Sequence, residues 1–433
     1  MSKFQKLIDE RHQTAQYMVD EITHICKNLP KRSPGTEGER MACEHMAQVL
    51  MNDCGCERAS IESFKCSPES FYGWIYITAT CALLACILYF IYPLIGAILC
   101  FLGMLVMILQ FGFYLQVIDW LFKVKKSHNV TAIKHCTKDV RARVFFNGHA
   151  DAAWNFPVNH RWGGVAYSAH VILAFSGVLY ILGLNIARAV RTAAQFSLLA
   201  PQNDILMFCL GLGSIVFIPF IVGIYFMWDE KVVVDGANDN LTGCYMGIGV
   251  LKAMHDAGIQ LDHTEVGVII TGSEEAGLRG ARNWCRAHKG EFDDVPTYIY
   301  SFDTIHDSKF LMVNYRDLNG TVEVDRAVSD SFINSARELG IPCAKGMVPP
   351  FGGATDSAAF AKAGYKVAGI TALNHSLEDY YHTVRDSWDN LNPECLAECY
   401  AITVNCLKKI DQATHDRLTM TPAPGEVAAD TAE

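Results

Sequence analysis

Three long stretches of the chain, 70–118, 163–187 and 205–228, contain no formally charged residue. A helix needs about 20 apolar residues to cross a bilayer, so the first stretch is long enough for two spans and each of the others for one. Tyr92-Pro93 lies near the middle of the first stretch, where a turn would fall. A buried helix of a soluble protein would normally keep a polar face over such a length. The pattern therefore predicts four membrane spans arranged as two hairpins.

Aromatic side chains gather near the ends of these stretches, as they do where spans meet the membrane–water interface. They are Trp74, Tyr76, Tyr114, Trp120, Trp162, Tyr167, Tyr225 and Trp228. Their positions support the prediction of an integral membrane protein with membrane lipid as a partner.

The other segments predict one α/β domain. Short runs rich in β-branched and aromatic residues are typical of buried strands, and segments with helical spacing of apolar residues alternate with them. The expected strands are 59–66, 130–136, 144–146, 266–270 and 298–302, and the expected helices are 5–27, 38–51, 242–257, 275–288, 327–339 and 393–411. This alternation favours a mixed, mostly parallel sheet with helices on both faces, interrupted by the two hairpins.

The chain thus divides into six segments. Three pieces form the α/β domain, two transmembrane hairpins separate them, and a Pro-, Ala- and acid-rich end predicts a disordered tail. The pieces of the domain are 1–69, 123–162 and 229–418, the hairpins are 70–122 and 163–228, and the tail is 419–433.

Charge and cysteine content narrow the class of protein. The net charge of −10 argues against a nucleic-acid partner, because phosphate binding needs a cationic face. Sixteen cysteines occur in a long chain that does not open with a signal-peptide pattern, so we expect reduced thiols in a protein that faces the cytosol.

Residues suited to bind metal ions gather in five short segments. Four of them follow an apolar strand or open a helix, which is where open α/β sheets place their sites. The segments are Asn147-Gly148-His149-Ala150-Asp151, Gly236 to Gly243 with Asp239, Thr271 to Gly277 with Glu274-Glu275, Asp303, and Tyr380-Tyr381-His382-Thr383.

Each segment has an ordinary interpretation when it is taken alone. A His-x-Asp sequence is often a surface pair, Glu-Glu often starts a solvated helix, and Asp-Asn can be a helix cap. The set is more specific, because two histidines and three carboxylates suffice for two divalent ions that share one bridging carboxylate. A further glutamate stands beside a ligand, where a general base is needed. Four other histidines, at 45, 160, 306 and 375, are interpreted as surface or core residues.

These segments resemble the co-catalytic di-zinc aminopeptidases, peptidase family M28. Arg32-Ser33-Pro34-Gly35-Thr36-Glu37-Gly38 and Asn129-Val130 also match the family pattern. The similarity covers about residues 1–69, 123–162 and 229–415. The four spans are not part of the common domain. In addition, Thr355-Asp356-Ser357 stands where many members have Ser-Asp-His, so a pocket histidine is missing.

The resemblance implies a role for each residue. His149 and Asp303 would hold one zinc ion, Glu275 and His382 the other, and Asp239 would bridge them. Asp151 would orient His149, Glu274 would be the general base, and Tyr381 would donate a hydrogen bond to the developing oxyanion. The two ions would activate a water and polarise the scissile carbonyl. The cofactor expected is two Zn²⁺, although Co²⁺ or Mn²⁺ can occupy such sites.

Three alternative functions are considered for these residues. The first is a peptidase, most simply an aminopeptidase with a peptide substrate, and the second is a di-zinc amidohydrolase or deacylase on a non-peptide amide. The third, a non-catalytic membrane scaffold, is disfavoured because the full ligand set and the base are present. Substrate preference, carboxypeptidase or acylase chemistry, and oligomeric state are not encoded in these motifs.

The hairpins also predict where the domain lies. Residues 123–126 carry three lysines after the second span and Arg161 precedes the third, which predicts a cytosolic domain, although Arg188 and Arg191 in the second turn favour the reverse. The second hairpin begins about 14 residues after His149 and ends about 11 before Asp239. At roughly 3.3 Å per residue these connections are short. Two alternatives follow: the metal cleft opens near the bilayer surface with the second hairpin as part of its rim, or the hairpin is only an anchor.

Overall fold

The computed structural model describes residues 3–194, 197, 199–200, 203–350, 352–374 and 380–420. His375 and nearly all of the predicted tail at 419–433 lie outside these residues. Residues 419 and 420 belong to the last helix, α13 (Pro393–Met420).

A mixed sheet organises the described part of the α/β domain. Eight strands follow one another in the order β1-β2-β6-β3-β7-β12-β8-β11. Four of the seven neighbouring pairs are parallel, and these include the central β6-β3-β7-β12 block. The strands are β1 (Arg58–Cys66), β2 (Lys125–Lys134), β3 (Ala142–His149), β6 (Thr264–Thr271), β7 (Thr297–Ile305), β8 (Leu311–Asn314), β11 (Ala344–Gly346) and β12 (Lys366–Ala372).

The central strands are covered by apolar side chains on both faces. Successive side chains of a strand point to opposite faces, and Phe145 and Phe146 accordingly join different buried clusters. The cluster around Phe146 includes residues of α2 (Arg11–Asn28), α3 (Glu37–Asn52), α9 (Thr242–Asp256), α11 (Arg326–Glu338) and α13. The cluster around Phe145 includes residues of α10 (Arg279–Ala287) and α12 (Asp356–Lys362). The expected mixed sheet between helical layers is therefore confirmed.

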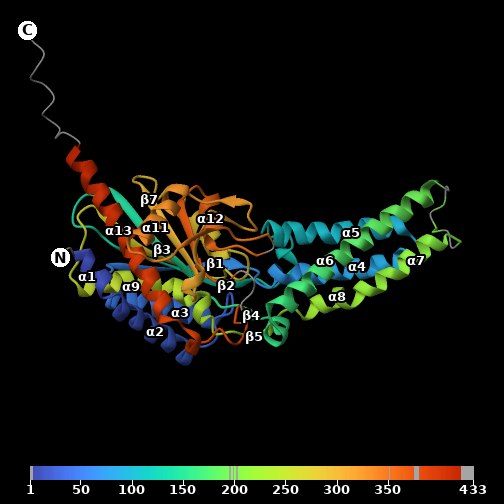
Figure 1. Ribbon diagram of the computed structural model, residues 1–433, viewed down its shortest axis with the longest axis horizontal. Helices are drawn as coiled ribbons and strands as arrows, with labels where there is room; N and C mark the ends of the chain where they lie inside the picture. Colours follow the sequence, from blue (N-terminus) through green and yellow to red (C-terminus); the bar gives the residue numbers. More distant parts are fainter. Residues whose placement is uncertain are drawn as a thin grey trace, which may run out of the picture.

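Four helices are long and apolar enough to cross a membrane: Ser70–Leu88, Pro93–Gly112, Pro157–Ala194 and Ile205–Phe226. They project together from one end of the α/β body as a single arm (Figure 1). The helices of the arm are α4 (Ser70–Leu88), α5 (Pro93–Met107), α6 (Pro157–Ala194), α7 (Ile205–Gly213) and α8 (Ile218–Gly223). Gly163, with φ of 79°, kinks α6 near its start.

The arm is packed inside and apolar outside. Small residues such as Ala79, Ala82 and Ala85 lie in its buried cluster, where they let the helices approach closely. Large apolar side chains such as Ile172 and Ile205 are exposed on its surface. A surface of this kind is suited to lipid rather than to water.

A short two-stranded ribbon closes the base of the second hairpin. Strand β4 (Trp154–Asn155) precedes α6 and pairs antiparallel with β5 (Asp229–Val233), which follows the fourth long helix. The chain therefore enters and leaves this hairpin at neighbouring points beside the α/β body.

Two helix predictions differ from the structure. The expected helix 5–27 is divided into α1 (Lys3–Asp9) and α2. The expected helix 275–288 begins only at Arg279, because the preceding residues form a turn in which Leu278 has φ of 56°. A left-handed residue cannot continue an α-helix, so Glu275 lies on a turn.

Candidate metal centre

Three of the expected ligands lie at the carboxyl-end region of the central strands. His149 is the last residue of β3, and Asp303 lies near the end of the parallel neighbour β7. Asp239 belongs to the short turn at Ala237–Leu241 that leads into α9. This edge of the sheet is where the sequence placed the site.

The structure brings all five expected ligands together with Glu274. Their ligand atoms form three overlapping groups, His149/Asp239/Asp303, Asp239/Glu275/His382 and His149/Glu274/Glu275. Oδ1 of Asp239 lies 3.1 Å from Nε2 of His149, and Oδ2 of Asp239 lies 3.3 Å from Nε2 of His382. Asp239 thus stands between the two histidines and presents one oxygen to each.

The remaining carboxylates lie beside one or the other histidine. Nε2 of His382 lies 3.2 Å from Oε2 of Glu275. Nε2 of His149 lies 3.9 Å from Oδ2 of Asp303 and 3.7 Å from Oε2 of Glu274. The first two ligand groups therefore coincide with the two ion pockets that the resemblance implied.

The residues fit divalent cations on physical grounds. Nε2 of His149 and Oε1 of Glu275 are buried and make no hydrogen bond within the described part of the chain. Burial, together with the Asp239 carboxylate, raises the pKa of Asp303 to about 8, and burial raises the pKa of Glu274 well above its usual range. Buried carboxylates at this density need a compensating cation, and imidazole nitrogens with carboxylate oxygens suit zinc.

Asp151 supports the site differently from the expectation. Its carboxylate accepts hydrogen bonds from the backbone N–H groups of Glu274 and Glu275, each at 3.0 Å. Its contact with Nδ1 of His149 is longer, at 3.5 Å, and the backbone carbonyl of Asp151 is nearer to that nitrogen, at 3.2 Å. Asp151 therefore fixes the backbone of the Glu274–Glu275 turn at least as much as it orients His149.

Two further buried carboxylates hold the loops of the site, and the sequence analysis gave them no role. Asp386 accepts the backbone N–H groups of Asn238, at 2.8 Å, and of Asp239, at 3.1 Å. Glu39 accepts the N–H and the hydroxyl of Ser273, both at 3.1 Å. The sequence contained a hint for each residue. Glu39 directly follows segment 32–38, which matches the family pattern, and Asp386 lies soon after His382.

Tyr381 lies where a hydrogen-bond donor could reach the site. Its half-buried ring stacks on His382 with the ring centroids 4.0 Å apart. Burial and the Asp239 carboxylate raise the pKa of the Tyr381 hydroxyl well above its usual range. The hydroxyl therefore stays protonated at neutral pH and can donate.

The bases of both hairpins add aromatic residues that the sequence analysis assigned at most to the membrane interface. The ring of Phe156 lies 4.7 Å from that of His382, and Tyr167 stacks on Phe156 at 5.3 Å. Tyr72, from α4, packs against Phe156 and is near enough to Glu275 to interact with it electrostatically. The metal centre therefore faces the arm.

The position without the pocket histidine is structural in this chain. The hydroxyl of Ser357 lies 2.5 Å from the buried carboxylate of Asp317, and the hydroxyl of Thr355 lies 2.5 Å from the same oxygen. Neither residue belongs to the ligand groups found among the described residues.

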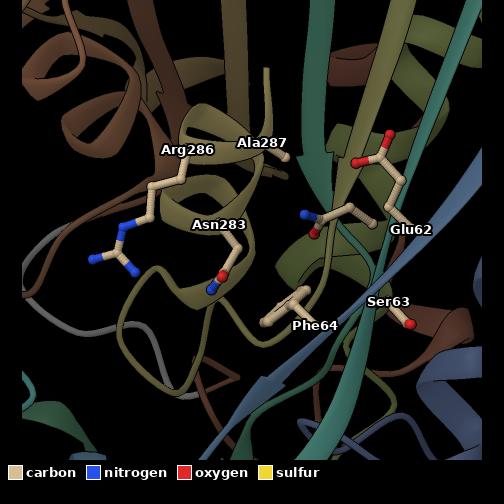
Figure 2. Close-up of a pocket in the computed structure, with 7 residues that line it drawn as sticks. Glu62, Ser63, Phe64, Asn283, Arg286 and Ala287 are labelled. Carbon is tan, nitrogen blue, oxygen red and sulfur yellow. The ribbon is translucent and has the colours of Figure 1, made fainter. Parts of the chain in front are cut away.

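A separate hollow of about 620 Å³ lies between β1 and α10. Figure 2 shows Glu62, Ser63 and Phe64 on its β1 side and Asn283 and Arg286 on its α10 side. None of the clustered ligands lines this hollow, so it is distinct from the metal centre.

Comparisons with known proteins bear on the family and the fold. Residues 227–407, which contain four of the five expected ligands, match the model of Peptidase family M28. No curated protein matches the chain. Among solved structures, a zinc aminopeptidase from Bacillus subtilis superposes with a TM-score of 0.53 at 12% identity, over 92% of this chain and 95% of that one.

Two other solved structures are equally similar in fold. An aminopeptidase from Aneurinibacillus sp. strain AM-1 has a TM-score of 0.54 at 12% identity, over 93% of this chain and 95% of the other. A glutaminyl cyclase from an Acidobacteriales bacterium has a TM-score of 0.51 at 13% identity, with the same coverage of each chain. The family match over residues 227–407 and the fold shared with zinc aminopeptidases are consistent with the resemblance to peptidase family M28, and together they support a zinc-dependent metallopeptidase.

Proposed function

We propose that this protein is a membrane-anchored di-zinc aminopeptidase that hydrolyses the first peptide bond of peptide substrates. The observation that carries the proposal is the position of Asp239, whose two carboxylate oxygens face two different histidines. Such a carboxylate divides the cluster into two ligand groups, His149/Asp239/Asp303 and Asp239/Glu275/His382. Each group supplies one histidine and two carboxylates, a set that suits zinc and that Co²⁺ or Mn²⁺ can also occupy.

His149, Asp239, Asp303, Glu275 and His382 would hold the two zinc ions, which would supply a bound water of lowered pKa and polarisation of the scissile carbonyl. Glu274 takes the proton of the attacking water and then delivers it to the leaving amine. Asp151 keeps the Glu274 backbone in place during both transfers.

Tyr381 stabilises the negative charge that develops on the carbonyl oxygen. Its hydroxyl is protonated. Tyr381 directly precedes His382 and stacks on its ring, so the hydroxyl can reach a substrate bound at the same centre. A fixed donor aimed at a developing oxyanion is worth about 10²–10³-fold in turnover.

Glu274→Gln tests the mechanism. We expect zinc content and fold to remain, while turnover of an aminoacyl anilide falls by roughly 10²–10⁴-fold, the usual contribution of a general base. Near-normal turnover of the zinc-loaded variant would exclude Glu274 as the base.

A di-zinc amidohydrolase or cyclase is the second candidate, and the fold shared with a glutaminyl cyclase favours keeping it in the comparison. The same assay decides between the two, because it can offer aminoacyl anilides, N-acyl amides and peptides with N-terminal glutamine side by side. Metal-dependent turnover of only the amides or glutamine peptides would replace the aminopeptidase assignment.

The proposed topology places four spans in the membrane and the α/β domain in the cytosol. The apolar arm supports the spans, and the lysines near residue 125 support the cytosolic side. Single cysteines at Lys123 and Arg191 test it by labelling from outside intact cells. We expect Arg191→Cys to react and Lys123→Cys to remain protected, and the opposite result would reverse the topology.

We also propose that the second hairpin forms part of the rim of the active site and admits hydrophobic peptides from the membrane surface. Phe156, which packs beside His382, and Tyr167, which stacks on Phe156, support this role. Replacing residues 163–228 by a Gly/Ser linker should reduce turnover of hydrophobic peptides selectively. Equal kinetics on small and hydrophobic substrates would leave the hairpin as an anchor alone.

A further inference from the structure

The turn that carries Glu274 and Glu275 has an unusual backbone. Ser273, Gly277 and Leu278 all have positive φ, at 53°, 96° and 56°. For residues other than glycine this conformation is sterically unfavourable, so contacts from the surroundings must maintain it. Internal hydrogen bonds contribute, including those from the N–H groups of Gly277 and Leu278 to the Glu274 carbonyl, at 2.7 and 2.9 Å.

Arg279 closes this turn from its carboxyl end. Its guanidinium is 2% exposed, and Nε donates to the carbonyl of Ala276, inside the turn, at 2.9 Å. Nη2 donates to Ser70 Oγ at 2.8 Å and to Asp119 Oδ1 at 2.9 Å, while Nη1 bonds the other oxygen of Asp119. The side chain therefore connects the turn to two residues outside it.

Both of these residues belong to the base of the first hairpin. Ser70 is the first residue of α4, and Asp119 follows α5. The Ser70 hydroxyl lies 2.6 Å from Asp119, and Gln110 donates to the Ser70 carbonyl at 3.1 Å. The two ends of the hairpin are thus joined to each other where they hold Arg279.

Apolar contacts reinforce the same junction. Phe71, next to Ser70, lies so close to the turn that a Cβ added to Gly277 would be 2.9 Å from its ring. Phe71 also shares a buried cluster with Ala276 and Leu278. Gly277 therefore meets two requirements: it adopts a positive φ, and its lack of a side chain lets Phe71 of the hairpin approach the turn.

We propose that Arg279 is a positioning residue, which the first hairpin holds through Asp119 and Ser70 so that the Glu274–Glu275 turn keeps the geometry needed to bind metal. The hairpin is then part of the support of the metal centre, and its removal would loosen the catalytic turn. The inference rests on the proposed function only where turnover is measured.

The test compares Asp119→Asn with Asp294→Asn in the full-length protein. Asp294 is a matched control, because its carboxylate also bonds a little-exposed arginine, Arg143, but at the start of β3. For Asp119→Asn we expect faster hydrogen exchange in peptides covering 273–279 and a zinc affinity lower by about 10–100-fold, as for other supporting contacts of metal sites. We expect kcat to fall while KM changes less than about twofold, since no substrate contact is removed. Asp294→Asn should change none of these.

Two further variants, Asp119→Glu and Ser70→Ala, distinguish a loss of this support from a general loss of folding. Asp119→Asn leaves the Arg279 charge buried without its partner, which is itself destabilising. Asp119→Glu keeps the charge and should restore exchange protection and zinc affinity. Ser70→Ala removes one neutral partner and should have a smaller effect in the same direction. Equal exchange and zinc affinity for Asp119→Asn and Asp294→Asn would overturn the proposal. Exchange and zinc binding are measured without substrate, so a failure of the aminopeptidase assignment would leave their outcome interpretable.

Discussion

The two sides of the proposed metal centre would use the same kinds of ligand on different supports. His149 and Asp303 lie on adjacent parallel strands in the middle of the sheet. Glu275 lies on a turn, and His382 lies on a loop with a φ of 52°. The strand-supported side is held by the sheet ladder and the buried clusters. The loop-supported side must be held by contacts from outside the sheet.

The arm supplies several of these contacts. The N–H of Phe156 donates to the His382 carbonyl at 2.7 Å, and the amide of Asn159 donates to the Tyr381 carbonyl at 2.9 Å. The first hairpin holds the Glu275 turn through Arg279. Insertions beside an active site can thus become part of its framework, and we expect the two sides to differ in metal affinity and in sensitivity to the arm.

The largest effect should come from the residue that both sides share. Asp239→Asn weakens the bond to each ion, so zinc content should fall on both sides and turnover should fall by more than about 100-fold, beyond the usual effect of a supporting residue. Metal analysis after gel filtration measures the stoichiometry. Two tightly bound zinc ions in the variant would show that Asp239 does not join the sides.

Single histidine variants should separate the sides. We expect His149→Ala and His382→Ala each to lose one zinc ion. The ion that remains in His382→Ala should bind as tightly as the tighter ion of the unaltered protein, because the strands hold its ligands. Isothermal titration with zinc measures this, and a weak remaining site would contradict the difference between the supports.

Removal of metal should proceed in two steps. The loop-supported side should release its ion at a lower chelator concentration, and unfolding temperature should fall at each step because ligands that bind the folded state stabilise it. A delipidating detergent should change the chelator concentration of the first step only, because the arm supports the loop-supported side. A single step of metal release that is insensitive to detergent would contradict the proposed difference between the two sides.

The smallest effect is expected from Asn159→Ala. Loss of its buried hydrogen bond to Tyr381 costs about 1–3 kcal/mol locally, so the weaker zinc ion should bind roughly 5–150-fold less tightly. Asn185→Ala is the control, because Asn185 is also a buried asparagine of α6 but donates to Ala85 and Ile181 within the arm. Equal zinc affinities for the two variants would argue against a role of the start of α6 in holding the loop-supported side.

The sequence predicted the sheet core and the ligands because both depend on local patterns. The apolar runs at 144–146, 266–270 and 298–302 lie within β3, β6 and β7, and the polar residues after them converge at one edge. Strands β8, β11 and β12 were missed. The first two are only four and three residues long, and β12 contains alanine and glycine, which are weak strand formers. The positions of these ligands could be predicted, but their roles remain proposals.

The supporting contacts were not predictable in the same way. Glu39 meets Ser273, and Asp119 meets Arg279, across more than 150 residues of chain. A carboxylate in a helical segment or after an apolar run has the same sequence appearance whether it is solvated or buried. Residues 275–278 of this turn were also predicted as the start of a helix, because the positive φ of Leu278 leaves no trace in the residue type.

The order of the strands has a consequence for biosynthesis. Strand β3 emerges from the ribosome between the two hairpins, whereas its neighbours on both sides, β6 and β7, emerge only after the second hairpin. Domains tend to fold as their chain becomes complete, so the sheet cannot close before both hairpins have been synthesised. Of the five metal-site residues, only His149 precedes that point. A nascent chain in which the second hairpin is not yet complete therefore lacks four of the five expected ligands and has no assembled site.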